Sequence, residues 1–101
     1  MRALIFAAAM LAIAPASAQD TAGRNLAASC AICHGTDGYA VSKDMVSLAG
    51  LPKDHIVQQM KDFRDGKRPA TVMHQLARGY SDAQIEAMAA WFAAQKRLPA
   101  P

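Results

Sequence analysis

The stretch Cys30-Ala31-Ile32-Cys33-His34 is the part of the sequence that decides the fold. Two thiols three positions apart, followed directly by an imidazole, form the C-x-x-C-H pattern that is typical of covalent attachment of a c-type haem. Both sulfurs lie within one turn of chain, where they can add to the two vinyl groups of a haem. The linkage places His34 under the porphyrin as the proximal iron ligand. The sequence therefore predicts one haem c, bound through Cys30, Cys33 and His34.

Three other interpretations of these residues fit the chain less well. A thioredoxin-like dithiol accompanies a β-α-β pattern, and no stretch of this chain has β character. A structural zinc site needs about four nitrogen or sulfur ligands, and His55 or His74 would have to join Cys30, Cys33 and His34 without a second closely spaced ligand pair. A disulfide between the two cysteines would close too small a loop to stabilise the fold much.

The N-terminal residues have the pattern of a cleaved export signal. Arg2 supplies a short positive region, residues 3–14 form an apolar run without a charge, and an A-x-A pattern ends at Ala18. This run is too short for a membrane span, which needs about 20 residues. We therefore expect residues 1–18 to be a cleaved signal peptide. Residues 19–101 would then form a periplasmic mature domain without a membrane span.

Length and charge limit the remaining possibilities. The 101 residues suffice for one domain, and loss of Arg2 lowers the formal charge from +3 to +2. Nucleic-acid binding is not expected, because the chain has no arginine-rich tract and no alternation of basic and aromatic residues. A domain of this size buries only a modest core. We therefore expect the haem to complete the core and the apo chain to be unfolded or molten.

The residues around the haem pattern predict a helix before it and a loop after it. Apolar spacing around Leu26 predicts a first helix over 21–29. Gly23 lowers helix stability by about 1 kcal/mol relative to alanine, so its presence indicates a close approach by another backbone. Turn residues follow at 35–38, and the aperiodic stretch to Gly50 predicts a loop that wraps the proximal side of the haem.

Two further principal helices and one short helical turn are predicted in the second half of the chain. Pro52 begins a helix that Gly66 ends, with an apolar stripe made by Ile56, Val57, Met60 and Phe63. Residues 67–71 read as an extended connection, followed by a short turn over 73–77. A capping box at Ser81 and Gln84 opens the last helix, which runs to about Gln95 with Ile85, Met88, Ala89 and Phe92 inside.

These elements predict an all-α architecture of three main helices plus a short one around one covalent haem. Gly23 and Leu26 are expected to pack against Trp91 or Phe92. We interpret the two aromatic residues as ordinary core packing, with no role as an electron relay.

Taken together, these features resemble a class I bacterial cytochrome c. The resemblance rests on the signal peptide, C-x-x-C-H-G at 30–35, the middle helix and A-x-W-F-A-A-Q at 89–95. Residues 47–50 and 59–73 are similar to the cytochrome subunit of flavocytochrome c sulfide dehydrogenase and to the cytochrome c4 and c553 groups. The resemblance implies a class I cytochrome fold and electron transfer, with redox protein partners that include a flavoprotein subunit. It also implies that the Val46 carbonyl, at a place where these families often have proline, accepts the proximal imidazole N–H.

The sixth iron ligand has to come from the spare methionines and histidines, which are Met45, Met60, Met73, Met88, His55 and His74. Met60 and Met88 lie on apolar helix stripes, which favours core packing. Met45 lies in the loop expected on the proximal side. Met73 follows Pro69 in an irregular stretch and matches the ligand methionine of the family in its R-P-A-T-x-M context. We predict Met73 as the distal ligand.

The two spare histidines are expected to lie away from the iron. Side chains at successive positions point in different directions, so His74 is expected to face solvent if Met73 faces the iron. His55 is expected on the protein surface.

His/Met ligation leaves no open iron position, which predicts a one-electron carrier and no enzyme activity of the chain alone. Two versions remain open: a haem subunit docked on a flavoprotein that oxidises sulfide, and a free shuttle to an oxidase or reductase. A gas-binding or peroxidatic protein is a further alternative, and would require Met73 to be absent from the iron. Four cations precede the Met73 segment: Lys61, Arg64, Lys67 and Arg68. They form either a positive rim that steers an acidic partner or, as we favour, a solvated helix face balanced by Asp62 and Asp65.

Overall fold

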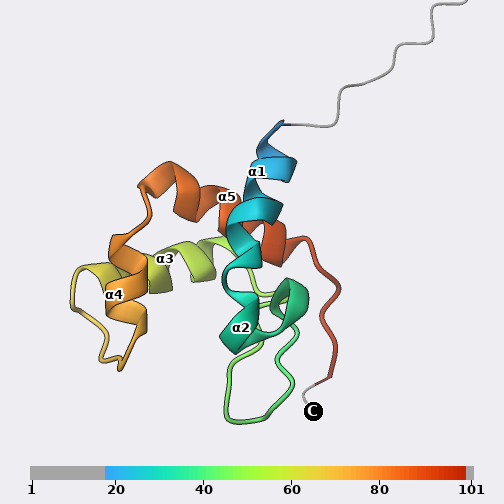
Figure 1. The fold of residues 1–101 in the computed structure, drawn as a ribbon, viewed down its shortest axis with the longest axis horizontal. Helices are drawn as coiled ribbons and strands as arrows, with labels where there is room; N and C mark the ends of the chain where they lie inside the picture. Colours follow the sequence, from blue (N-terminus) through green and yellow to red (C-terminus); the bar gives the residue numbers. More distant parts are fainter. Residues whose placement is uncertain (1–17, 100–101) are drawn as a thin grey trace, which may run out of the picture.

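The computed structural model describes residues 18–99, and these form an arrangement of helices without a strand (Figure 1). The expected signal peptide lies outside the described residues, apart from Ala18. The elements are α1 (Ala18–Ala28), α2 (Ala31–His34), the 3₁₀ turn η1 (Thr36–Gly38), α3 (Lys53–Arg64), α4 (Met73–Arg78) and α5 (Asp82–Ala93). The all-α prediction is confirmed. Across the described range, no helix has the length and apolar character that crossing a membrane requires.

The three principal helices of the prediction are α1, α3 and α5, and the short one is α4. α1 begins at Ala18, three residues before its expected start. The haem-attachment segment, residues 30–34, was expected to be a turn. In the structure its residues 31–34 form one turn of helix, α2. Pro52 caps α3 from the position just before its first residue, where its missing N–H costs no helical hydrogen bond.

Gly23 sets how closely α1 and α5 pack. A Cβ atom at Gly23 would lie 2.5 Å from the Ala87 carbonyl oxygen and 3.4 Å from the Trp91 Cβ. The predicted close approach of a second backbone is therefore confirmed, and the nearest backbone atom belongs to Ala87. Leu26 and Trp91 both pack against the buried core, as expected.

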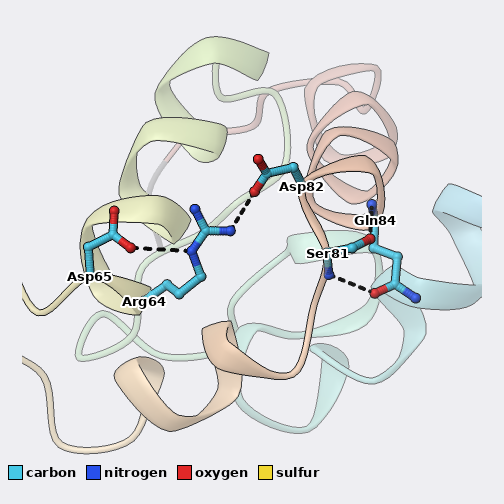
Figure 2. A network of polar contacts seen from close by, with 5 residues as sticks. All are labelled: Arg64, Asp65, Ser81, Asp82 and Gln84. Atoms are coloured by element: carbon cyan, nitrogen blue, oxygen red, sulfur yellow. Dashed lines mark hydrogen bonds and ion pairs between the residues drawn. The ribbon is translucent and has the colours of Figure 1, made fainter.

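The core lies where α1, α3 and α5 meet, and it consists of Ala27, Ile56, Val57, Ile85, Met88, Ala89 and Phe92. All four residues predicted inside the last helix are buried, and Ile85 and Ala89 are 0% exposed. The start of α5 is fixed by the predicted capping box (Figure 2). Ser81 Oγ accepts from the Gln84 backbone N–H at 3.1 Å, and the Ser81 N–H donates to Gln84 Oε1 at 2.9 Å.

A polar contact joins the end of α3 to the start of α5 (Figure 2). The Arg64 guanidinium donates to the Asp82 carboxylate and also lies 3.4 Å from Asp65 Oδ1. The hydrogen bond from Arg64 and its positive charge lower the pKa of Asp82. Because these groups are exposed, solvent screening keeps the contribution of the pair to stability small.

Candidate haem site

The attachment segment follows α1 almost directly. Cys30 caps the N-terminus of α2, and the His34 N–H donates to the Cys30 carbonyl oxygen at 2.9 Å. Gly35, with φ of 81°, ends this turn, and a Cβ atom there would collide with the Tyr39 carbonyl oxygen. A glycine is therefore required for the chain to reverse directly after His34.

The two cysteines are free thiols in different surroundings. Cys33 is exposed, whereas Cys30 is half-buried. Burial is the main cause that raises the pKa of the Cys30 thiol, the charge of Cys33 adds to it, and a hydrogen bond with Ser29 opposes it. The segment thus presents one sulfur to solvent and one toward the interior.

The His34 imidazole is fixed by one hydrogen bond from the other side of the attachment segment. Its side chain is buried, with 8% of the residue exposed. Nδ1 lies 2.8 Å from the Val46 carbonyl oxygen, which confirms the predicted contact. Because a carbonyl oxygen only accepts hydrogen bonds, Nδ1 carries the proton and Nε2 keeps its lone pair. This arrangement fixes the tautomer and raises the basicity of a metal-binding imidazole.

Cys30, Cys33, His34 and Met73 line one cavity of about 640 Å³. This volume is within the range of about 300–1,000 Å³ that is usual for ligand and cofactor sites. Met73, the first residue of α4, reaches the cavity from a different part of the chain than the attachment segment. Two thiols, an imidazole with a free Nε2 and a thioether, in a largely apolar cavity, make a donor set that fits a covalently bound haem.

Apart from His74, the other candidates for the sixth iron ligand also line this cavity. Met45, Met60 and Met88 line it together with Met73, and so does His55, an exposed residue as expected. Met88 belongs to the buried core, Met60 packs against that core, and Met45 adjoins Val46 in the proximal loop. These positions agree with their predicted roles and leave Met73 as the thioether on the separate α4 segment.

The prediction that His74 faces solvent is wrong. The residue is half-buried, and its Nδ1 is buried without a hydrogen-bond partner. α4 packs against α3, and helical spacing places His74 on the same stripe as the fully buried Ala77. Met73 and Leu76 lie on the neighbouring stripe and line the cavity. His74 is not among the cavity-lining residues.

Two contacts near the cavity had no signal in the sequence. The hydroxyls of Ser29 and Tyr80, both lining the cavity, lie 3.0 Å apart and join the end of α1 to the turn before α5. The Arg68 guanidinium, also at the cavity, lies 4.9 Å from the centre of the Phe63 ring.

The four cations that could form a docking rim, Lys61, Arg64, Lys67 and Arg68, differ in their contacts and exposure. Arg64 is held by Asp82 and Asp65, and Arg68 lies at the cavity. Lys67 is exposed and Lys61 is half-buried. Within residues 18–99, no three His, Cys, Asp or Glu side chains are grouped so that they could hold a metal ion directly.

Comparison with known proteins places the chain in a family. No family model matches the sequence. The chain is 33% identical over 78 residues to cytochrome c-554(548) of Halomonas halodenitrificans, and the match covers 74% of this chain and 94% of that protein. The chain is a class I c-type cytochrome. It is therefore an electron-transfer protein with covalently bound haem c.

Two further relatives agree with this assignment. The cytochrome is 36% identical over 93 residues to cytochrome c4 of Pseudomonas aeruginosa, covering 92% of this chain and 46% of that protein. It is 38% identical over 73 residues to the cytochrome subunit of sulfide dehydrogenase of Chlorobaculum tepidum, covering 72% of this chain and 66% of that protein. The chain thus spans about half the length of the cytochrome c4 that it matches.

A solved structure shows the same fold. The structure of cytochrome c4 from Acidithiobacillus ferrooxidans superposes with a TM-score of 0.71 at 29% sequence identity. The superposition covers 76% of this chain and 50% of that chain. The class I cytochrome fold expected from the sequence resemblance is therefore confirmed.

Proposed function

We propose that this cytochrome is a periplasmic one-electron carrier with a single haem, covalently held by Cys30 and Cys33 and ligated by His34 and Met73. The observation that carries the proposal is the cavity that all four residues line, with His34 Nδ1 fixed on Val46 so that Nε2 is free to bind iron. The periplasmic location rests on the signal-peptide pattern of residues 1–18.

The residues of the site explain why the chain transfers electrons and does no further chemistry. A bound haem c supplies the one-electron Fe(III)/Fe(II) couple. The hydrogen bond to Val46 fixes the orientation of the His34 ring, which would keep the reorganisation small when a bound haem changes oxidation state. Met73 would supply a thioether ligand to the iron, and a thioether favours the ferrous state and raises the reduction potential.

For the physiological role we favour a haem subunit that accepts electrons from a flavoprotein of the sulfide dehydrogenase type. The similarity to the cytochrome subunit of a sulfide dehydrogenase supports it. The second candidate is a free shuttle to an oxidase or reductase, supported by similarity to the thiosulfate dehydrogenase electron acceptor of Thiomonas intermedia. Purification from the native host separates the two, because a subunit carries a flavoprotein with it in stoichiometric amount and a shuttle does not.

The ligation is tested by optical spectra of the mature protein in both redox states, after expression with c-type maturation machinery. We expect a low-spin spectrum with the far-red sulfur-to-iron band. Met73→Ala should abolish this band and open the iron to carbon monoxide and cyanide. Met45→Ala is the matched control, because Met45 also lines the cavity, and it should keep the band.

Three results would contradict the proposal. A high-spin wild-type spectrum that shifts with carbon monoxide would mean an open iron and a gas-binding or peroxidatic protein. Persistence of the far-red band in Met73→Ala would assign the distal position to another methionine, and loss of the band in Met45→Ala would name Met45.

A further inference from the structure

The loop between Tyr39 and Gly50 carries the carbonyl that holds the proximal histidine. Its base is closed by backbone hydrogen bonds, since the N–H groups of Leu48 and Ala49 donate to the Gly38 carbonyl oxygen at 2.8 and 3.2 Å. Next to these bonds, on the loop side, the Ala40 N–H donates to Ser47 Oγ at 3.0 Å. The loop is therefore a closed unit whose position depends on what holds its base.

Two hydrogen bonds hold this base, one to the segment that follows α5 and one to the last turn of α5 itself, and the segment runs alongside the loop in Figure 1. The Tyr39 hydroxyl donates to the Lys96 carbonyl oxygen at 2.6 Å. The Gly50 N–H donates to the Phe92 carbonyl oxygen at 2.8 Å. A Cβ atom at Gly50 would lie 2.6 Å from the Arg97 Cβ, so the two chain segments are in close contact.

Packing contributes little to the position of Val46 itself. The residue is 59% exposed. It borders the haem cavity on one side and a second cavity of about 450 Å³ on the other, which Tyr39 and Leu98 also line. Side chains with space on both sides are not fixed by neighbours. The position of the Val46 carbonyl therefore depends on the hydrogen bonds that hold the loop.

We propose that Tyr39 is a positioning residue for the proximal haem ligand: by binding Lys96, it anchors the loop whose Val46 carbonyl accepts the His34 ring N–H. The proposal rests on the ligation of iron by His34 proposed above. Donation from Nδ1 increases the basicity of the imidazole and favours ferric iron. Releasing the loop from the C-terminal segment therefore weakens the His34–Val46 hydrogen bond and shifts the redox equilibrium toward the ferrous state.

The test compares wild type with Tyr39→Phe, which removes only the hydroxyl and keeps the ring, in the haem-loaded protein. The first measurement is exchange of the His34 ring N–H, followed by NMR after selective ¹⁵N-histidine labelling. We expect exchange to accelerate about three- to tenfold, the factor that one neutral hydrogen bond supplies. The second is the reduction potential, which should rise by about 18 mV for a twofold shift, at 59 mV per tenfold.

Two further variants separate this role from general loosening. Ser81→Ala removes the cap of α5, which lies outside the haem cavity and outside the loop, so His34 N–H exchange should stay at the wild-type rate. A chain that ends at Gln95 lacks Lys96 and should accelerate exchange as Tyr39→Phe does. Tyr39→Phe should add nothing to the effect of the truncation, because the shortened chain already lacks the Lys96 carbonyl oxygen, together with Arg97.

The outcomes distinguish this proposal from the ligation on which it rests. Unchanged exchange and potential in Tyr39→Phe, in a protein whose wild-type spectrum shows His/Met ligation, would refute the role of Tyr39 alone. Equal acceleration in Ser81→Ala would refute it as well, since loosening would then be general. A wild-type spectrum without histidine ligation would overturn both proposals together.

Discussion

Replacing Gly23 by alanine tests the closest contact in the fold. A Cβ atom at this position would lie 2.5 Å from the Ala87 carbonyl oxygen and 3.2 Å from its carbonyl carbon. Both are backbone atoms within α5, so they cannot rotate away as a side chain would. α1 and α5 must therefore separate, and Trp91, whose Cβ lies 3.4 Å from the same point, must move with α5.

Two opposing contributions determine the size of the effect. Alanine within a helix is favoured over glycine by about 1 kcal/mol. Overpacking a well-packed contact costs about 1–3 kcal/mol. Because the obstructing atoms are backbone, we place the overpacking cost in the upper part of that range. The net expectation is that Gly23→Ala lowers the free energy of unfolding by about 1–2 kcal/mol.

Guanidinium unfolding of the haem-loaded protein measures this difference. The fluorescence of Trp91, the only tryptophan in the chain, is a suitable signal, because Trp91 packs against the buried core and becomes solvated on unfolding. Gly79→Ala is the matched control, since Gly79 has φ of −78° and its Cβ would meet only the Leu76 oxygen at 3.4 Å. It should raise the free energy of unfolding by about 0.4–1 kcal/mol.

Substitutions at Gly66 show what backbone strain alone costs, without the crowding present at Gly23. It has φ of 73° and no atom within 4 Å of a Cβ, so Gly66→Ala should destabilise by about 1–2 kcal/mol through its backbone alone. Gly66→Asn should recover most of that loss, because asparagine tolerates this conformation. At position 23, by contrast, no side chain larger than alanine should recover the stability lost in Gly23→Ala, because the Cβ atom itself is obstructed. If Gly23→Ala is as stable as wild type while Gly79→Ala behaves as expected, the close packing of α1 on α5 is refuted.

Three further outcomes follow from other parts of the molecule. Ser81→Ala removes the cap of α5 and should lower the free energy of unfolding by about 1 kcal/mol, measured by the same titration; no loss would mean that the capping box does not stabilise α5. Arg64 lowers the pKa of Asp82, which stabilises the folded state above the unfolded pKa and loses effect as the pH falls through the folded pKa. Asp82→Asn should therefore be less stable than wild type near neutral pH and converge with it as the pH falls through the folded pKa of Asp82, whereas a difference that does not change with pH would contradict the linkage. The chain without haem should bind ANS and lack a near-UV CD signal, because the cavity would leave the core incomplete; a cooperative thermal transition of the apo chain would contradict this expectation.

Local signals in the sequence predicted the parts of the structure that depend on neighbouring residues. The capping box at Ser81 and the apolar period after it located α5 and its buried face, because both signals lie within one helix. Gly23 indicated a close approach by another backbone, because glycine lowers helix stability and is expected within a helix where a Cβ atom would not fit. The sequence could not name Ala87 as the partner, because the nearest atom is a main-chain oxygen and carries no residue signature.

Contacts between distant loops could not be predicted from the sequence. The Tyr39–Lys96 and Ser29–Tyr80 hydrogen bonds join residues 57 and 51 positions apart, and neither lies in a periodic stretch. For His74 the sequence did provide a local rule, and the rule was correct, but the prediction drawn from it, that His74 faces solvent, was wrong. Adjacent side chains do point in different directions, but packing of α4 on α3 buries the direction that His74 takes.

The pairing of α1 with α5 also governs when the Cys30 thiol can become buried during synthesis. Gly23 and Ala87 are 64 positions apart, and both cysteines lie between them. At about 5–20 residues per second, Ala87 is added roughly 3–13 s after Gly23. Until then the contact at Gly23 has no partner, and the core cannot close over Cys30. We therefore expect Cys30, like the exposed Cys33, to stay accessible in the nascent chain at least until α5 has been synthesised.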